Sequence, residues 1–152
     1  MKLKIGDYLK PSVYLLKKDN VVVYIGSSIN GLYRALSHAC VDPIKDFDEV
    51  ELINCEANKL INLESELIIK YQPLYNSTIP SPDFITLNRF RQKYCRGQIT
   101  DMTLPELKKK VKRAGITPKG SFNGKVYYRL KEIYEMVVGY ADEKHRKRNG
   151  DI

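Results

Sequence analysis

The sequence predicts an α+β protein in which a small three-stranded antiparallel sheet is flanked by helices and followed by a mainly helical, basic domain. Short runs of β-branched and aromatic residues in the first half are interleaved with two helical patterns. The last third is rich in lysine and arginine. A chain of 152 residues suffices for one ordinary domain or two small ones, and 43% hydrophobic and 29% charged residues are typical of globular proteins.

The predicted sheet begins with a β-hairpin. Residues 12–17 and 21–25 are rich in β-branched and aromatic side chains, and Lys18-Asp19-Asn20 between them is suited to a tight turn. Residues 47–54 alternate apolar and acidic side chains, which indicates a third strand with one face in water.

The length of the hairpin loop decides which residues face each other. A three-residue loop pairs residue 17 with residue 21. It therefore places Tyr14 opposite Tyr24 on one face of the sheet. A two-residue loop would instead pair Tyr14 with Ile25 and put the two phenols on opposite faces. We expect the three-residue loop, because it allows both tyrosines to share a site.

Two helices are expected to flank the sheet. Asn30 is a suitable N-cap for a helix over about residues 31–40. On that helix Arg34 and His38 are four positions apart and so project from one face. Residues 56–71 carry apolar side chains at helical spacing, which predicts the second helix.

The second half gives weaker signals. Residues 88–94 could form a short basic helix. Thr103 is a candidate N-cap and Glu106 completes a capping box, so we expect a helix that ends at about Arg113. Residues 126–129 are compatible either with a short strand or with the start of a further helix.

These signals divide the chain into a first domain over residues 1–77, a linker over 78–101 and a basic helical region over 102–152. Residues 1–100 carry 13 Lys and Arg against 11 Asp and Glu, a net charge of +2, whereas residues 101–152 carry 13 against 7, a net charge of +6. This asymmetry suggests chemistry in the first half and binding of a polyanion such as DNA by the second.

The three cysteines, Cys40, Cys55 and Cys95, fit neither a disulfide framework nor a zinc site, because they are odd in number and lack C-x-x-C spacing. We expect reduced, mostly buried thiols. No apolar run is long enough for a signal peptide or for the ~20 residues of a membrane span. We therefore expect a cytoplasmic protein with no membrane partner.

An ordered set of polar and aromatic residues in the first half carries the strongest functional signal. It combines two phenols, a guanidinium, an imidazole, a carboxylate and a closing amide, which are the groups needed to cut a phosphodiester bond with one hard metal ion. The set consists of Val13-Tyr14-Leu15, Tyr24-Ile25-Gly26, Arg34, His38, Glu64 and Pro73-Leu74-Tyr75-Asn76.

In the order and spacing of these residues, the segment from about 11 to 77 resembles the GIY-YIG nuclease domain. Tyr24-Ile25-Gly26 is the second half of that signature, and Val13-Tyr14-Leu15 occupies the first half. The first glycine of the signature is replaced by Ser12 in this chain. The resemblance covers about half of the chain and implies a metal-dependent DNA endonuclease.

The resemblance implies a role for each residue of the site. Glu64 would bind one Mg²⁺ or Mn²⁺, with waters completing the coordination, and Arg34 would hold a phosphate oxygen. Tyr24 would orient the water or the scissile phosphate. Either Tyr14 or His38 would be the general base, since a phenol needs a lowered pKa to act at neutral pH, whereas imidazole titrates near neutrality.

Other residues would support the site or bind DNA. Gly26 would allow a close approach of the backbone, and Asn76 would buttress the site with amide hydrogen bonds. Ser27 could donate to a phosphate or cap the turn. The second half is weakly similar to small helix-turn-helix modules with a short wing, and its basic side chains suit phosphate contacts. These side chains are Lys108, Lys109, Lys110, Lys112, Arg113 and Lys119.

The leading hypothesis is an endonuclease that hydrolyses DNA phosphodiester bonds one strand per active site, as a monomer or as a DNA-dependent dimer. A first alternative is a non-catalytic DNA-binding protein on a degenerate scaffold, which the missing glycine keeps open. A structural or regulatory protein is a third class, and it would show no salt-dependent affinity for DNA.

Overall fold

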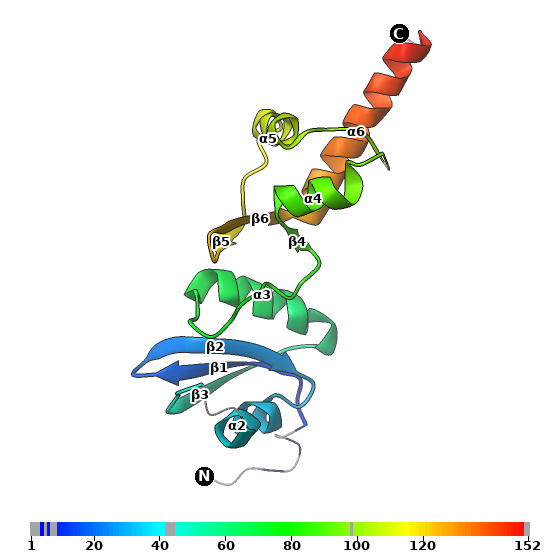
Figure 1. The fold of residues 1–152 in the computed structure, drawn as a ribbon. Coiled ribbons are helices and arrows are strands. Elements are labelled where there is room, and N and C mark those ends of the chain that lie inside the picture. The colour runs from blue at the N-terminus through cyan, green and yellow to red at the C-terminus, as the bar shows by residue number, and fades with distance from the viewer. Residues whose placement is uncertain (1–3, 5, 7–8, 42–44, 98, 151–152) are drawn as a thin grey trace. The chain divides into compact units, whose positions relative to one another are not determined.

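The computed structural model describes residues 4, 6, 9–41, 45–97 and 99–150. The chain divides into two compact units, Met1–Ser81 and Pro82–Ile152 (Figure 1). Among the helices of the described residues, none is both long and apolar enough to cross a lipid bilayer. The cysteines form no disulfide, and Cys95 is buried whereas Cys40 is exposed.

The first unit is an antiparallel sheet with a helix on each face (Figure 1). Its strands are β1 (Ser12–Lys18), β2 (Val21–Ser28) and β3 (Glu49–Asn54), in the spatial order β2-β1-β3. Its helices are α2 (Gly31–Val41), the short 3-10 helix η1 (Ala57–Lys59) and α3 (Leu60–Tyr71). The predicted three-stranded sheet with flanking helices is thus confirmed.

The central strand is buried on both faces. Val13, Tyr14, Leu15 and Leu16 are all at most 2% exposed. Because α2 and α3 cover opposite faces of the sheet, successive side chains of β1 point into two separate cores, and the strand therefore lacks an apolar–polar alternation. This burial fixes the position of the Tyr14 side chain.

The hairpin turn is one residue shorter than expected. Asp19 and Asn20 both have positive φ angles, 49° and 65°, and they form a two-residue turn between Lys18 and Val21, which pair with each other. Positive φ at both central residues matches the right-handed twist of the strands. The register then shifts between Leu16 and Lys17, so that β2 contains one extra residue, a β-bulge.

The predicted pairing of Tyr14 with Tyr24 is therefore wrong, although both phenols do lie on one face. Tyr14 is opposite Gly26, and Tyr24 is opposite Leu16. The short turn alone would have separated the two rings, but the bulge restores the parity of the side chains. The ring centroids are 6.3 Å apart.

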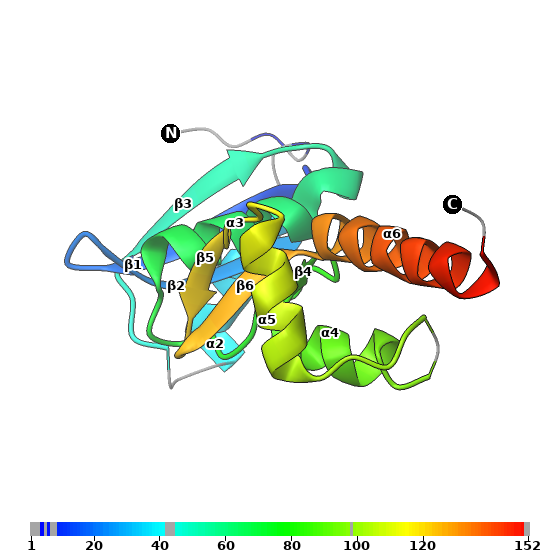
Figure 2. The ribbon, with the colours of Figure 1, turned by 90° about the horizontal axis from the view of Figure 1, so that it is seen from above.

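The second unit is a helical domain with a small sheet (Figure 2). Its elements, in chain order, are β4 (Phe84–Ile85), α4 (Leu87–Tyr94), α5 (Leu104–Arg113), β5 (Gly120–Phe122), β6 (Lys125–Arg129) and α6 (Leu130–Asn149). The strands lie in the order β4-β6-β5. The capping box at the start of α5 is confirmed, since the Thr103 side chain accepts from the backbone N–H of Glu106 while the Glu106 carboxylate accepts from that of Thr103.

The segment that we expected to be a linker, residues 78–101, contains β4 and α4 and belongs largely to the second unit. Phe90, fully buried, packs with Leu107, Ile133 and Val137 in the core of that unit. The sequence signal is weak because β4 is only two residues long and α4 buries only two of its side chains. The short basic helix expected at 88–94 is present.

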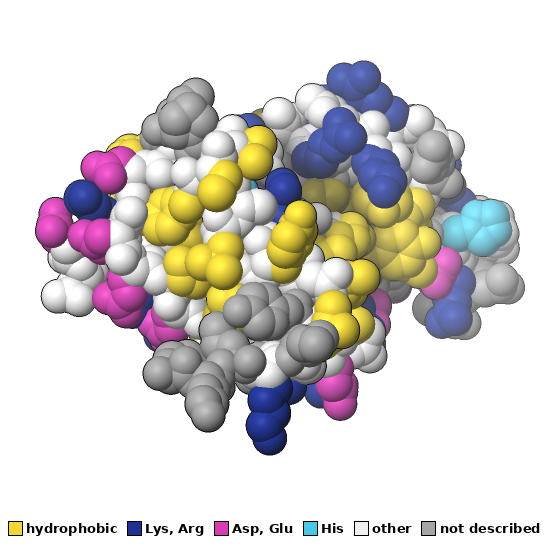
Figure 3. All heavy atoms as spheres, turned by 90° about the horizontal axis from the view of Figure 1, so that it is seen from below, with side chains coloured by type: hydrophobic (Ala, Val, Ile, Leu, Met, Phe, Trp, Pro, Cys, Tyr) yellow, Lys and Arg dark blue, Asp and Glu magenta, His cyan; other side chains and the backbone are white. Residues whose placement is uncertain are grey.

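The outer side of α2 carries exposed apolar side chains (Figure 3). These include Tyr33, Leu36 and Val41 on the helix and Ile29 just before it. The opposite side of the helix, with Ala35 and His38, faces the sheet and is buried. The position of His38 on that inner side is what brings it to the tyrosines.

Candidate active site

A tyrosine–histidine pair lies between the sheet and α2. The Tyr14 hydroxyl and His38 Nε2 are 3.0 Å apart, and the two residues are 2% and 5% exposed. The Tyr24 ring completes the cluster, with its centroid 5.1 Å from that of His38. His38 lies one turn beyond Arg34 on α2, as the four-residue spacing predicts. This position brings the imidazole to the two tyrosines.

Tyr14 is influenced by the other charged groups of the predicted set. Burial raises the pKa of its phenol, the neighbouring Tyr24 and Glu64 raise it further, and Arg34 opposes them through its charge and a side-chain hydrogen bond. The net direction is upward, so the phenol is held in its neutral form. A neutral phenol hydrogen-bonded to an imidazole can accept one proton while passing on another.

Gly26 makes room for this phenol. It lies directly opposite Tyr14 in the β1–β2 ladder. A Cβ at position 26 would overlap the hydroxyl and Cζ of Tyr14 and would lie 2.9 Å from its Cε2. Glycine is required here because the ring of Tyr14 lies across the backbone of β2, which is a close approach of a side chain rather than a special φ angle.

Asn76 ties the segment after α3 to the outer edge of the sheet. Its Oδ1 accepts from the backbone N–H of Ile25 at 2.8 Å, and its Nδ2 donates to the carbonyl of Ile25 at 2.8 Å. The backbone N–H of Tyr75 donates to the carbonyl of Val23 at 2.9 Å. These bonds satisfy the free edge of β2 next to the tyrosines, as a supporting role for Asn76 requires.

Glu64 is held by Ser27. The Ser27 hydroxyl donates to Glu64 Oε2 at 2.6 Å, which joins the end of β2 to α3. Burial raises the pKa of the Glu64 carboxyl, and the hydrogen bond from Ser27 opposes that rise. The Ser27 hydroxyl, which was expected to donate to a phosphate or to cap the turn, is bonded to the carboxylate in this structure. Glu66, on the same helix, is exposed.

The sequence did not single out Lys45. Its ammonium group lies 4.1 Å from the centroid of the Tyr24 ring, a distance typical of a cation–π contact. Lys45 follows α2 in an irregular segment, outside any periodic pattern, and no spacing rule relates it to Tyr24. It adds a second cation to the site beside Arg34.

No protein-family profile matches the chain, and no curated protein sequence matches it. Among solved structures, the chain is similar to the GIY-YIG N-terminal endonuclease domain of UvrC from Thermotoga maritima. A tyrosine-to-phenylalanine variant bound to its catalytic divalent cation is 27% identical, with a TM-score of 0.42, and the magnesium-bound form is 27% identical, with a TM-score of 0.40. Each match covers 49% of this chain and 100% of that domain.

The first unit accommodates Ser12, which stands where the expected signature has its first glycine. Ser12 is 1% exposed, and its hydroxyl lies 2.7 Å from Oδ1 of Asn54 and 3.1 Å from the carbonyl of Lys10. A Cβ on Gly31, the first residue of α2, would lie only 2.5 Å from the Cβ of Ser12. The space that the missing glycine would have left is thus provided by Gly31, and Tyr14 keeps its place.

The residues present fit a hard cation better than a structural zinc ion. Among the described residues, no group of three or more His, Cys, Asp or Glu side chains converges as a metal cluster. Within the described part of the chain, Glu64 offers the one carboxylate of the predicted set, and its burial leaves the negative charge poorly solvated. One carboxylate with several waters suits Mg²⁺ or Mn²⁺, whereas a structural zinc site needs four protein ligands.

The cations predicted to contact DNA lie in the second unit and differ in their surroundings. Lys110 lies 3.2 Å from the centroid of the Tyr140 ring and so packs against α6, while Lys119 forms a 3.5 Å ion pair with Glu132. The other predicted cations are exposed on α5, namely Lys108, Lys109, Lys112 and Arg113.

Proposed function

We propose that the chain is a metal-dependent endonuclease that hydrolyses DNA phosphodiester bonds, one strand per active site, with Mg²⁺ or Mn²⁺. The observation that carries this proposal is the convergence on Tyr14, which is hydrogen-bonded to His38 and within electrostatic reach of Tyr24, Arg34 and Glu64. These residues come from four separate elements. A core tyrosine needs none of these polar neighbours for packing.

The metal held by Glu64 would stabilise the charge on the phosphate and on the leaving oxygen. Ser27 holds one oxygen of this carboxylate and so fixes its direction. Arg34 is exposed on α2 and can present its donors to a non-bridging oxygen of an incoming phosphate, where negative charge develops. Lys45 lies over the ring of Tyr24.

Tyr14 and His38 act together as the base in this proposal. The attacking water gives its proton to the Tyr14 oxygen while the phenol proton passes to His38 Nε2, which accepts it when the ring proton is on Nδ1. The phenol therefore never needs to ionise. This relay explains why a tyrosine whose pKa is raised can still serve, and it includes both candidates for the general base.

The non-catalytic alternative rests on the missing first glycine. Because Gly31 accommodates Ser12, this departure from the signature does not displace Tyr14 from its partners. We therefore favour the active nuclease.

A single site cuts one strand at a time, so a double-strand break would require a second copy of the chain or a second encounter.

The test is a nicking assay on supercoiled plasmid with added Mg²⁺ or with a chelator. Wild type should nick only with the metal, and Glu64→Gln should lose at least about a hundredfold in rate, since metal stabilisation of the transition state amounts to several kcal/mol. Glu66→Gln is the matched control, because it makes the same chemical change on an exposed position of the same helix. Equal nicking by both variants would refute the proposal.

A further inference from the structure

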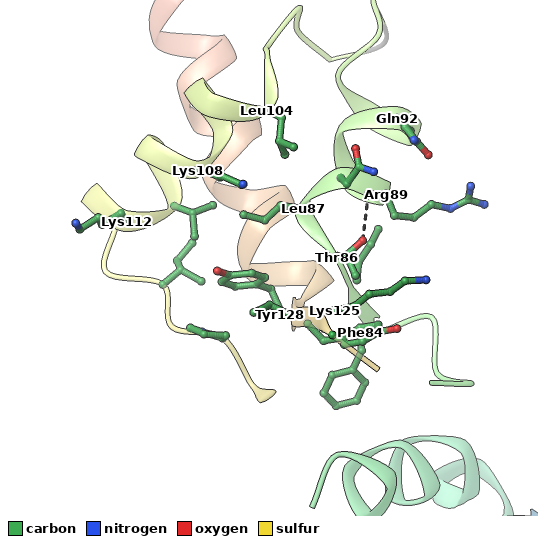
Figure 4. A pocket seen from close by; sticks show the side chains of 18 residues that line it. Phe84, Thr86, Leu87, Arg89, Gln92, Leu104, Lys108, Lys112, Lys125 and Tyr128 are labelled. Atoms are coloured by element: carbon green, nitrogen blue, oxygen red, sulfur yellow. Dashed lines mark hydrogen bonds between the residues drawn. The ribbon is translucent and has the colours of Figure 1, made fainter. Parts of the chain in front are cut away.

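A groove of about 950 Å³ lies within the second unit, between α4 and α5 (Figure 4). It is lined by β4, by α4, by one side of α5 with the segment after it, and by β6 with the turn before it. We call it the α4–α5 groove. All of its lining residues belong to the second unit and to the described part of the chain.

The charge of the α4–α5 groove has one sign. Four cations line it, namely Arg89 of α4, Lys108 and Lys112 of α5, and Lys125 of β6, while none of its lining residues is Asp or Glu. The start of α4 also opens on the groove, with Thr86 as its N-cap accepting from the N–H of Arg89. The helix dipole places positive potential at that end. The ligand should therefore be an anion.

The cations do not converge as they would around a small anion. In Figure 4 the head group of Lys112 points to one side of the groove, those of Arg89 and Lys125 point to the other, and that of Lys108 points toward the middle. Lys108 and Lys112 are one turn apart on α5, about 6 Å along the helix axis, and the other two cations belong to α4 and β6. Cations distributed over three elements suit an extended polyanion whose charges repeat along its backbone.

The aromatic residues of the groove argue for duplex rather than single-stranded DNA. Single strands bind by stacking their bases on exposed aromatic rings. Here Phe84 is 6% exposed and Arg129 lies over its ring at 5.0 Å, while Tyr128 packs against the hydrophobic core. Burial also raises the pKa of the Tyr127 phenol. None of these rings is presented as an open stacking surface.

We propose that the α4–α5 groove binds the sugar-phosphate backbone of duplex DNA, with the exposed side of α5 turned toward the major groove. A major groove about 12 Å wide admits an α-helix. The proposal rests on the proposed function only in that DNA is the shared substrate. It assigns DNA binding to Arg89 and Lys125, which the sequence did not indicate, as well as to Lys108 and Lys112.

The experiment measures binding of a fluorescently labelled mixed-sequence duplex to the full chain, by anisotropy, at several salt concentrations and with a chelator present. Two variants each remove two groove cations: Lys108→Gln/Lys112→Gln on α5, and Arg89→Gln/Lys125→Gln on the other side. Lys93→Gln/Arg96→Gln is the matched control, because these exposed residues belong to the same unit, lie outside the groove and remove the same charge.

Each groove variant should reduce the slope of log affinity against log salt by about two, because each lost phosphate contact lowers it by about one. The control should keep the wild-type slope. Wild-type slopes for both groove variants, an equal loss in the control, or equally tight binding of the single strand would each overturn the proposal. Thermal melting verifies folding, and the two groove variants change different elements, so one remains informative if the other unfolds.

The chelator makes this outcome independent of cleavage. If the chain binds duplex through the groove but never nicks plasmid, the proposed nuclease fails and the binding site stands. If Glu64→Gln abolishes nicking while the groove variants bind as wild type does, the nuclease stands and the binding site fails.

Discussion

The two units place their polar side chains in opposite ways. In the first unit, Tyr14 and His38 are buried, bonded to each other and surrounded by strands and helices that fix their positions. In the second unit, the groove cations are exposed, come from three elements and point in different directions. The first arrangement positions a few atoms precisely, while the second spreads charge over a surface.

This difference teaches where substitutions should act abruptly and where they should act by degrees. A relay of hydrogen bonds fails when any member is removed, because the remaining group has no partner. Phosphate contacts add up nearly independently, and each one contributes a part of the affinity. Three experiments test this contrast at the first unit's relay, at its packing and at the second unit's helix cap.

The largest effect is expected at the relay. Tyr14→Phe removes the hydroxyl that would pass the proton of the water to His38 in the proposed relay, and His38→Gln removes the acceptor of that proton. Each should lower the nicking rate by about 10²–10⁴, the usual contribution of general acid–base catalysis. The double variant should be no slower than the slower single variant, because the two residues act as a unit.

Plasmid nicking rates and duplex affinity of all three variants provide the measurement. Affinity should stay close to wild type, since neither residue is exposed to bind DNA. Losses that multiply in the double variant would show two independent roles, and the first unit would then resemble the second in its additivity.

The next effect concerns packing between β1 and α2. Gly31→Ala places a Cβ 2.5 Å from that of Ser12 and should destabilise the first unit by about 1–3 kcal/mol, as overpacking of a core does. Adding Ser12→Gly should restore most of that loss, because it removes the opposing side chain. Gly139→Ala is the control, since nothing lies within 4 Å of a Cβ there.

Urea unfolding of the two single variants and the double variant gives the coupling energy. A double variant as unstable as Gly31→Ala alone would mean that position 31 is constrained by the backbone and not by Ser12. The serine would then have no compensating partner, and the non-catalytic alternative would regain its support.

The motif residues of the first unit could be read from the sequence because their spacing follows from regular elements. Arg34 and His38 meet the tyrosines through helical periodicity, and Glu64 is positioned by the stripe of its own helix. The two-residue turn and the bulge at Val23 could not be predicted from the sequence, because one extra residue in an apolar strand does not change its apolar pattern. Their effects on side-chain parity cancel, so Tyr14 and Tyr24 were predicted on one face from a wrong register.

The second unit was harder to predict, because its decisive features are contacts between elements. β4 has only two residues and gives no period. Arg89 and Lys125 are ordinary surface cations in the sequence, and only the packing of α4, α5 and β6 brings them to the same groove. Likewise, nothing in the sequence relates Lys45 to Tyr24 or Ser12 to Gly31.

The smallest effect is expected at the helix cap of α5, where the second unit does use a locally fixed polar contact. The backbone N–H of Thr103 donates to the Glu106 carboxylate at 2.8 Å and lowers the pKa of that group below its ordinary value of 4.5. A carboxyl whose pKa is lower in the folded state stabilises the fold above its ordinary pKa, and this stabilisation is lost as pH falls through the folded pKa. Glu106→Gln should therefore lower the melting temperature of the second unit slightly at neutral pH, and the difference from wild type should vanish well below pH 4.5. Calorimetric melts across this range measure it. A difference that persists at low pH would mean that the contact depends on the shape of the side chain rather than on its charge, and the contrast between a precise site and a dispersed surface charge would then have no counterpart within α5.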